Sequence, residues 1–187
     1  MQAIKIDELD AARRIVDLAI KLHFSQGDPV GVHTLTVTAY RILRRHGQEK
    51  RLPDIVPEYL DLIHQADRHL FWSSLSCLDP VSVKTPGAQD TPFWELAIEI
   101  TDLLLFICCA LFRMLDNQHT HEMRIFIIWY KAINPLKHGH DPIFNAKTRD
   151  GFDYLNSLTR EKQLNMGYDA LRNLKKPEGQ SLSTIRQ

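Results

Sequence analysis

Nine histidines are more than a chain of 187 residues usually carries, and two groups of them contain residue types that bind metals. The first group is His119, His121 and Glu122, and the second is His138, His140 and Asp141. Imidazole and carboxylate are common metal ligands, so the two groups would supply a site if their segments met. Neither group has a specific spacing such as HExxH. We therefore expect no metal cofactor and interpret the imidazoles as groups that cap helix carbonyls.

Three carboxylates, Glu95, Glu99 and Asp102, recur at i, i+4 and i+7 and so share one helix face. With Asp61 and His64 they match the residue types of carboxylate-bridged metal sites in four-helix bundles. Those sites need a Glu-x-x-His pair on each of two helices, and the chain has one Asp-x-x-His and no second. We therefore interpret the carboxylates as a solvated acidic face near a helix N-terminus, where negative charge is favoured.

The densest basic segment contains Arg41, Arg44, Arg45, His46, Lys50 and Arg51. The three arginines point away from the apolar stripe of their helix, so we expect them in water. Binding of a phosphate-bearing partner is one interpretation of this segment, and a solvated basic face is the favoured one. His46 lies on the stripe and is expected to pack or cap at the helix end.

Arg113 and His119 are separated by five residues, where one helix is expected to end and the next to begin. This spacing resembles the R-x(4–6)-H motif of HEPN ribonucleases, which are compact helical dimers that cleave RNA without a metal. The resemblance implies that Arg113 holds a phosphate bidentately and that His119 moves the proton of the attacking 2′-hydroxyl. Met114 departs from the motif, which usually has a polar residue after the Arg. A nucleic acid is expected as partner only under this alternative.

Apolar residues recur at three- and four-residue steps along most of the chain, which predicts an all-α fold of about six or seven helices. The expected helices span about 7–24, 28–47, 57–77, 91–117, 121–133, 151–164 and 166–175, with loops at 79–92 and 134–151. Asp7, Asp28 and Thr120 are expected to cap, with Pro29 at a first helical position and Gly47 in a left-handed turn.

Buried stripes are predicted for the first three helices from this spacing. They are Ala11, Ile15, Leu18, Ala19 and Leu22 on the first, Val32, Leu35, Ala39, Ile42 and Leu43 on the second, and Tyr59, Leu60, Ile63 and Ala66 on the third. The segments 93–117 and 121–133 are apolar on nearly all faces and are expected to form an enclosed central pair. Few one-sided helices remain to cover that pair, so we expect a homodimer or larger assembly.

Composition indicates a soluble globular protein, with 44% hydrophobic and 25% charged residues. Lys and Arg number 23, as do Asp and Glu, which excludes the broad positive field of a general nucleic-acid binder. Neighbouring Cys108 and Cys109 in an apolar run predict buried thiols in a reducing compartment. The start lacks signal-peptide features, and the run 103–112 is about half of what a membrane span needs. We expect a cytoplasmic protein without membrane contact, folded over 1–175 as one domain with a disordered tail at 176–187.

The segment DPVGVHTLTVTAYRILRRHG resembles the D-P-V-S-x-H-T-L helix of an uncharacterised family of helical bacterial proteins. Segments similar to IHQADRH, LLLF and MRIFIIWY follow in that family, so the resemblance covers about 8–135. It implies a helical fold and a bacterial origin, and no reaction. It points to His33, His64, Asp67 and Arg68 as ligand-binding candidates. His33 lies off the predicted stripe of its helix and is expected to face a partner or a pocket.

No Gly-rich phosphate loop, G-x-S-x-G motif or readable Cys–His pair is present in the sequence. We therefore predict a non-catalytic helical binding or regulatory protein whose ligand the sequence does not name. The HEPN-like ribonuclease with Arg113 and His119 is the alternative.

Overall fold

The computed structural model describes residues 5–61, 63–75, 98–116, 118–134 and 146–173, which contain eight α-helices, one 3-10 turn and no strand. In chain order the elements are α1 (Glu8–Phe24), α2 (Pro29–Glu49), α3 (Val56–Leu60), η1 (Gln65–Asp67), α4 (Arg68–Leu75), α5 (Ile98–Asp116), α6 (His121–Ile133), α7 (Ala146–Ser157) and α8 (Arg160–Asn173). The all-α prediction is confirmed. Within these residues, no helix combines the length and the apolar character needed to cross a membrane.

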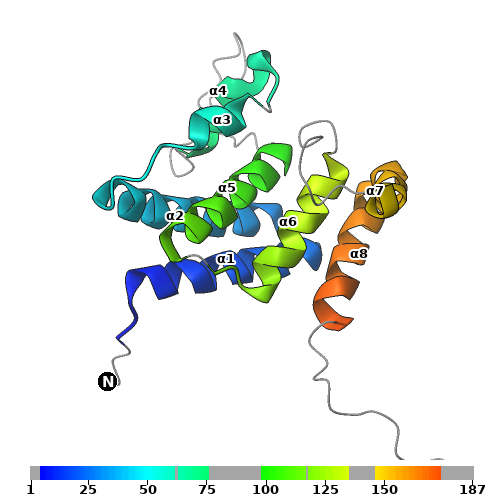
Figure 1. Cartoon of the computed structure of the whole chain (residues 1–187), viewed down its shortest axis with the longest axis horizontal. Coiled ribbons are helices and arrows are strands. Elements are labelled where there is room, and N and C mark those ends of the chain that lie inside the picture. Colours follow the sequence, from blue (N-terminus) through cyan, green and yellow to red (C-terminus); the bar gives the residue numbers. More distant parts are fainter. Residues whose placement is uncertain (1–4, 62, 76–97, 117, 135–145, 174–187) are drawn as a thin grey trace, which may run out of the picture.

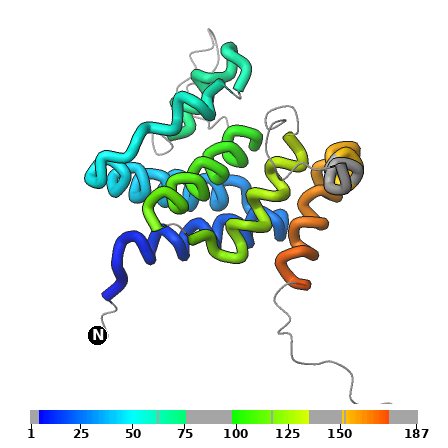
Figure 2. Tube along the Cα trace, viewed as in Figure 1, coloured from blue at the N-terminus to red at the C-terminus, as the bar shows by residue number. Residues whose placement is uncertain are grey.

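Helix α2 lies between α1 and α5, and these contacts are the most extensive in the described structure. Helix α6 packs against α1 and α5, while α8 packs against α1 and α6 (Figure 1). The short helices α3 and α4 contact α5 and project from the body of the molecule (Figure 2). The N-terminal and C-terminal parts of the chain therefore meet, because α1 contacts α8.

Helix α5 forms the centre of the core and is buried almost continuously from Ile100 to Leu115. Phe106 of α5 stacks on Tyr130 of α6 with ring centroids 4.5 Å apart. Helix α6 has a broad buried face, but Ile128 on its other side is 49% exposed. Of the expected central pair, α5 is thus enclosed and α6 is open on one side.

The predicted N-terminal caps are all confirmed. The Asp7 carboxylate accepts the backbone N–H groups of Leu9 and Asp10, and the Thr120 hydroxyl accepts that of Met123. Asp28 caps α2, with Pro29 at the first helical position, where its missing N–H removes no bond. Local capping chemistry therefore predicts the starts of α1, α2 and α6.

The predicted end of α2 is wrong. Gly47 stays helical, α2 continues to Glu49, and the left-handed conformation falls on Arg51, with φ 57°. The N–H of Leu52 donates to the Gly47 carbonyl at 2.9 Å and the N–H of Arg51 to that of Gln48 at 3.0 Å. These two bonds form a Schellman motif, which tolerates a non-glycine residue here because both carbonyls are satisfied.

The predicted stripe of α1 is only partly correct, because Ala19 is buried and Ile15 packs against the core, but the buried face is rotated from the predicted one. Leu18 is 52% exposed, and the face that is buried consists of Ala12, Val16, Asp17, Ala19, Ile20, His23 and Phe24. Helix α1 has apolar residues on both faces, so spacing alone cannot choose between them. On α2 the buried residues also include His33, Thr36 and Tyr40, because α2 is covered by α1 on one side and by α5 on the other.

Several predicted helix limits are also wrong. The helix expected over 57–77 is divided into α3, η1 and α4, because His64 adopts an extended conformation with ψ 138° and Ala66 is exposed. Helix α7 begins at Ala146 inside the expected loop 134–151, and the break after it falls at 158–159 instead of near 165. The Ser157 hydroxyl donates to the Tyr154 carbonyl at 2.7 Å, which competes with continuation of the helix. The expected loop 79–92, the start of the helix expected at 91 and the tail 176–187 lie outside the described residues.

Gly167 sets the distance between α8 and α1. A Cβ atom at this position would lie 2.1 Å from Cε1 of Phe24, a fully buried ring in the core. Neither the ring nor the packed helix has room to move, so only glycine permits this approach.

We expect Gly167→Ala to destabilise the fold by about 1–3 kcal/mol, because the added methyl group overpacks the contact between α1 and α8. Gly151→Ala is the matched control, since a Cβ atom at this position of α7 would meet nothing within 4 Å. The control should be neutral or stabilising by about 0.5–1 kcal/mol through helix propensity. Urea unfolding of both variants measures the difference, and equal stabilities would contradict this view of the contact.

Candidate functional site

Asp102 lies in the first half of α5 and is 3% exposed, so the predicted solvated acidic face is wrong at this position. Glu99 is exposed, and Glu95 lies outside the described residues. The difference arises because Asp102 directly precedes the run of α5 that is enclosed on all sides. A carboxylate at such a place must find a partner inside the protein.

Arg160, the first residue of α8, supplies that partner. Its Nη2 lies 2.8 Å from Oδ1 and 2.6 Å from Oδ2 of Asp102. The guanidinium also lies over the Trp129 ring of α6, with its carbon 4.8 Å from the ring centroid. The Trp129 indole N–H donates to the Gln163 carbonyl at 2.9 Å. One ion pair and one ring therefore join α5, α6 and α8.

His23 reaches the same place from the last turn of α1. Its Nε2 lies 3.5 Å from Oδ1 of Asp102 and makes no hydrogen bond of normal geometry with any described residue. Its ring packs edge-on against Trp129, with centroids 5.2 Å apart. Burial, with a further contribution from the Arg160 charge, lowers the pKa of His23 to about 3, so the imidazole is neutral at physiological pH.

Burial has the opposite effect on the carboxyl group. Desolvation raises the pKa of Asp102 to about 7, although the Arg160 charge and hydrogen bonds act to lower it. The pair of His23 and Asp102 thus consists of a base that resists protonation and an acid that retains its proton to near-neutral pH. Perturbed groups of this kind are concentrated at functional sites, and structural ion pairs also produce them.

A cavity of about 220 Å³ lies beside this cluster. His23, Thr101 and Arg160 give it polar groups, while its apolar wall comes from Pro29, Val32, Ile98 and Leu164. The remaining lining, Gln26 and Gly27, belongs to the turn between α1 and α2. A mostly apolar cavity with a few convergent polar groups is the usual form of a small-molecule site. We take it as the candidate functional site.

His33 is expected to face a partner or a pocket, but it is 2% exposed between α2, α5 and α4 and does not line the cavity. Its Nε2 donates to the Ser74 carbonyl at 3.0 Å, which leaves Nδ1 to accept the Thr101 hydroxyl at 2.9 Å. Burial lowers the pKa of His33, which favours this neutral form. Since Thr101 lines the cavity, the hydrogen bond from its hydroxyl to His33 holds this wall of the candidate site in place.

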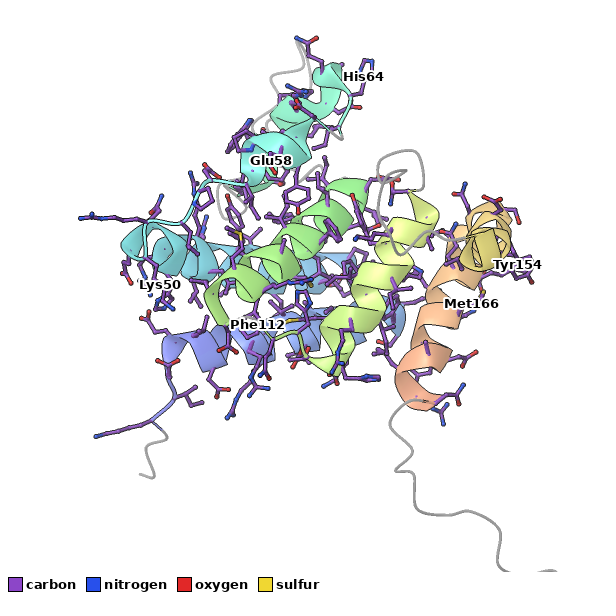
Figure 3. All side chains as sticks on the ribbon, in the orientation of Figure 1. Lys50, Glu58, His64, Phe112, Tyr154 and Met166 are labelled. Atoms are coloured by element: carbon purple, nitrogen blue, oxygen red, sulfur yellow. The ribbon has the colours of Figure 1, made fainter. Side chains whose placement is uncertain are left out.

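The other three positions of the family resemblance lie elsewhere, on the projecting part of the molecule. His64 is exposed at its tip (Figure 3), where its Nδ1 accepts the N–H of Ala66 at 3.3 Å. Arg68 pairs with Asp61 at 2.9 Å, and Asp67 is exposed. Arg68 begins α4, whereas the Ser74 contact of His33 lies in its last turn. The structure therefore does not bring the four residues together.

The pair Arg113 and His119 lies at the junction of α5 and α6. The His119 Nε2 donates to the Cys109 carbonyl at 2.9 Å, so this imidazole caps a helix carbonyl as expected for the histidine groups. Burial is the main cause that lowers the pKa of His119, and the positive charges of Arg113 and Arg124 lower it further. Arg113 is exposed and makes no ion pair with a described residue.

Within the described parts of the chain, no three His, Cys, Asp or Glu side chains gather in a way that would hold a metal ion. His121 lies beside His119 in sequence, and its Nε2 has no hydrogen-bond partner among the described residues. His138 and His140 lie outside them, so the prediction of no metal cofactor stays a prediction.

Sequence reasoning missed His23 and Arg160 and misplaced Asp102. A usable signal was present, because Asp102 adjoins the apolar run LLLFICCALF, where a carboxylate is buried if the helix is enclosed. Arg160 had no comparable signal, since it occupies an ordinary polar segment and acts only because α8 returns to α1.

No protein-family model, curated protein or solved structure matches this chain.

The opposite pKa shifts predict opposite effects of pH on two variants. Between pH 3 and 6.5 the unfolded chain protonates His23 and the folded chain does not, so this group makes stability fall as pH falls. Between pH 3.8 and about 7 the folded chain retains the proton of Asp102, so stability from this group is fully present at low pH and is lost as pH rises.

We compare the free energy of unfolding of each variant with that of the unsubstituted chain. For His23→Gln this difference should become about 2 kcal/mol more favourable to the variant when the pH is lowered from 7 to 5, because the acid-sensitive group is removed. Asp102→Asn should lose stability relative to the unsubstituted chain over the same range. Urea unfolding at both pH values measures each difference. The other titrating groups are present in all three chains, so their contributions to the pH dependence of the free energy of unfolding cancel in the comparison. Parallel pH profiles for the three chains would contradict the assigned shifts.

Proposed function

We propose that the protein is a non-catalytic binding or regulatory protein whose cavity beside Asp102 takes a small, mostly apolar ligand. The observation that carries the proposal is a mostly apolar cavity lined by polar side chains from three helices, His23, Thr101 and Arg160. Only some of the hydrogen-bond donors of Arg160 are used. Nη2 of Arg160 serves both oxygens of Asp102, whereas its Nη1 and Nε make no hydrogen bond with a described residue. These donors suit a ligand oxygen that accepts hydrogen bonds.

The size of the cavity limits the ligand to about one ring. An apolar cavity of about 150 Å³ binds benzene in a well-studied engineered protein, so about 220 Å³ suits a ring with one short polar substituent. The preferred substituent is a carbonyl or carboxylate oxygen placed on Arg160. A carboxylate would compete with Asp102 for the guanidinium, so its binding should be accompanied by proton uptake at Asp102.

The site favours binding over catalysis for a physical reason. His23 has a pKa of about 3 and is nearly buried, so it is a poor base at neutral pH. Asp102 has a pKa of about 7, but it does not line the cavity and both of its oxygens contact Arg160. A ligand in this cavity would contact the α1–α2 turn, α5 and α8 together. It would therefore stabilise the contact between α1 and α8, which is a suitable element for regulation.

Benzamide and benzoate are suitable probes, with benzene as the probe that lacks the oxygen. We expect the two oxygen-bearing probes to raise the melting temperature and to give measurable heats in calorimetry, and benzene to bind more weakly. Benzoate should bind more tightly at pH 6 than at pH 8, whereas benzamide should depend little on pH. Leu164→Trp fills the cavity and should abolish binding.

Met166→Trp is the matched control for this experiment, because Met166 is an exposed residue of the same helix that does not line the cavity. It should bind the probes like the unsubstituted chain. Probes that bind equally well to both tryptophan variants, or that do not bind to the unsubstituted chain at all, would contradict the proposed site.

A ribonuclease of the HEPN type is the second candidate function. It is supported by the exposed Arg113, which pairs with no described residue and whose charge lowers the pKa of His119, and by the Nδ1 of His119, which is the nitrogen left for proton transfer. Under this candidate the purified chain cleaves mixed RNA in EDTA, and Arg113→Ala with His119→Ala abolishes the cleavage. Absence of cleavage by the unsubstituted chain would exclude it and leave the binding function.

We infer further that the chain acts as a homodimer in the bacterial cytoplasm. The exposed apolar residues Leu18 and Ile128, which lie on α1 and α6, support an assembly that covers them. The family resemblance supports the bacterial origin, and the buried Cys108 and Cys109 suit a reducing compartment.

A further inference from the structure

A second hollow, of about 380 Å³, lies on α2 away from the cavity beside Asp102. It is lined by Tyr40, Arg41, Arg44, Arg45, Gln48 and Leu75. The three arginines and Gln48 lie within about two turns of α2, and Leu75 closes the hollow from the end of α4. The basic segment seen in the sequence is thus a concave surface, on which Arg41 and Arg45 are exposed to solvent as expected.

The hollow has an excess of positive charge. Arg45 pairs with Glu8, which is shared with His46 at 3.2 Å, while Arg41 and Arg44 make no ion pair with a described residue. Arg41 donates one N–H to the Leu75 carbonyl at 2.6 Å, and its other donors remain available. Two of the three arginines that line the hollow therefore have no carboxylate partner among the described residues.

Tyr40 adds a donor at the wall of the hollow. It is 2% exposed, and its hydroxyl makes no hydrogen bond of normal geometry with any described residue. Arg44 lies over its ring with the guanidinium carbon 5.9 Å from the centroid, near enough to lower the pKa of Tyr40 against the stronger effect of burial, which raises it. A buried donor without an acceptor is unfavourable, and an anion that draws Arg44 off the ring would supply one.

We propose that this hollow binds the phosphate group of a small phosphomonoester. Arginine guanidiniums bind phosphate oxygens with paired, charge-assisted hydrogen bonds, and a phosphate dianion offers enough acceptors for Arg41, Arg44, Gln48 and Tyr40 together. The confined set of donors favours one phosphate over a polynucleotide backbone, which needs a row of cations along its path. The site is independent of the cavity beside Asp102.

Calorimetry of the full chain with glycerol 3-phosphate, inorganic phosphate, sulfate and a 12-nucleotide single-stranded RNA tests the proposal. We expect glycerol 3-phosphate and inorganic phosphate to bind, and sulfate to bind more weakly because its less basic oxygens are weaker hydrogen-bond acceptors. Arg41→Gln with Arg44→Gln should weaken binding by about tenfold or more. Arg124→Gln with Arg172→Gln, which removes the same charge from exposed sites on α6 and α8, should leave binding unchanged.

Two further variants separate binding from folding. Arg44→Gln alone leaves the contact of Arg41 with Leu75 in place and should still weaken binding. Tyr40→Phe should change the free energy of unfolding little, because the hydroxyl proton has no acceptor among the described residues, and should weaken phosphate binding by about threefold to tenfold. Equal losses in both double variants, or no binding of either phosphate by the unsubstituted chain, would overturn the proposal. RNA that binds more tightly than glycerol 3-phosphate through Arg41 and Arg44 would overturn it in favour of a nucleic-acid surface.

Discussion

A buried carboxylate on the central helix is the constraint on which the arrangement of the other helices depends. Asp102 lies where α5 is enclosed, so its charge must be compensated from a neighbouring helix. Arg160 provides that compensation only if α8 packs closely on α1 and α6, and Gly167 permits this close approach to Phe24. The last part of the described chain is therefore held in place by a charge near the middle of the sequence.

The same constraint explains where the molecule has room for ligands. Arg160 and His23, which surround Asp102, also line the cavity, and the cavity extends from them to the α1–α2 turn. Helix α2 has a role in both proposed sites, because Val32 at its start borders this cavity and Arg44 near its end borders the basic hollow. His33 belongs to the first site indirectly, through the hydroxyl of Thr101.

The sequence predicts the fold class and the starts of the capped helices α1, α2 and α6, because those depend on local chemistry, as the caps formed by Asp28 and Thr120 illustrate. It fails where two faces of a helix are equally apolar, as on α1, because the phase is then decided by distant helices. It also fails at His64, where a side-chain cap interrupts a segment with helical spacing. The candidate site could not be assembled from spacing, since His23, Asp102 and Arg160 lie on three helices and only one of them stood in a recognisable pattern.

The most direct test of this account is a double-mutant cycle on the buried pair, measured by urea unfolding at pH 8, where Asp102 is ionised. Arg160→Gln leaves a buried carboxylate without its partner and should destabilise the fold by about 3 kcal/mol or more. Asp102→Asn should have a smaller effect, because the Arg160 side chain is 35% exposed and retains access to water. The variant with both substitutions should be more stable than Arg160→Gln alone. Losses that simply add, or an Arg160→Gln variant as stable as the unsubstituted chain, would contradict the central role of the pair.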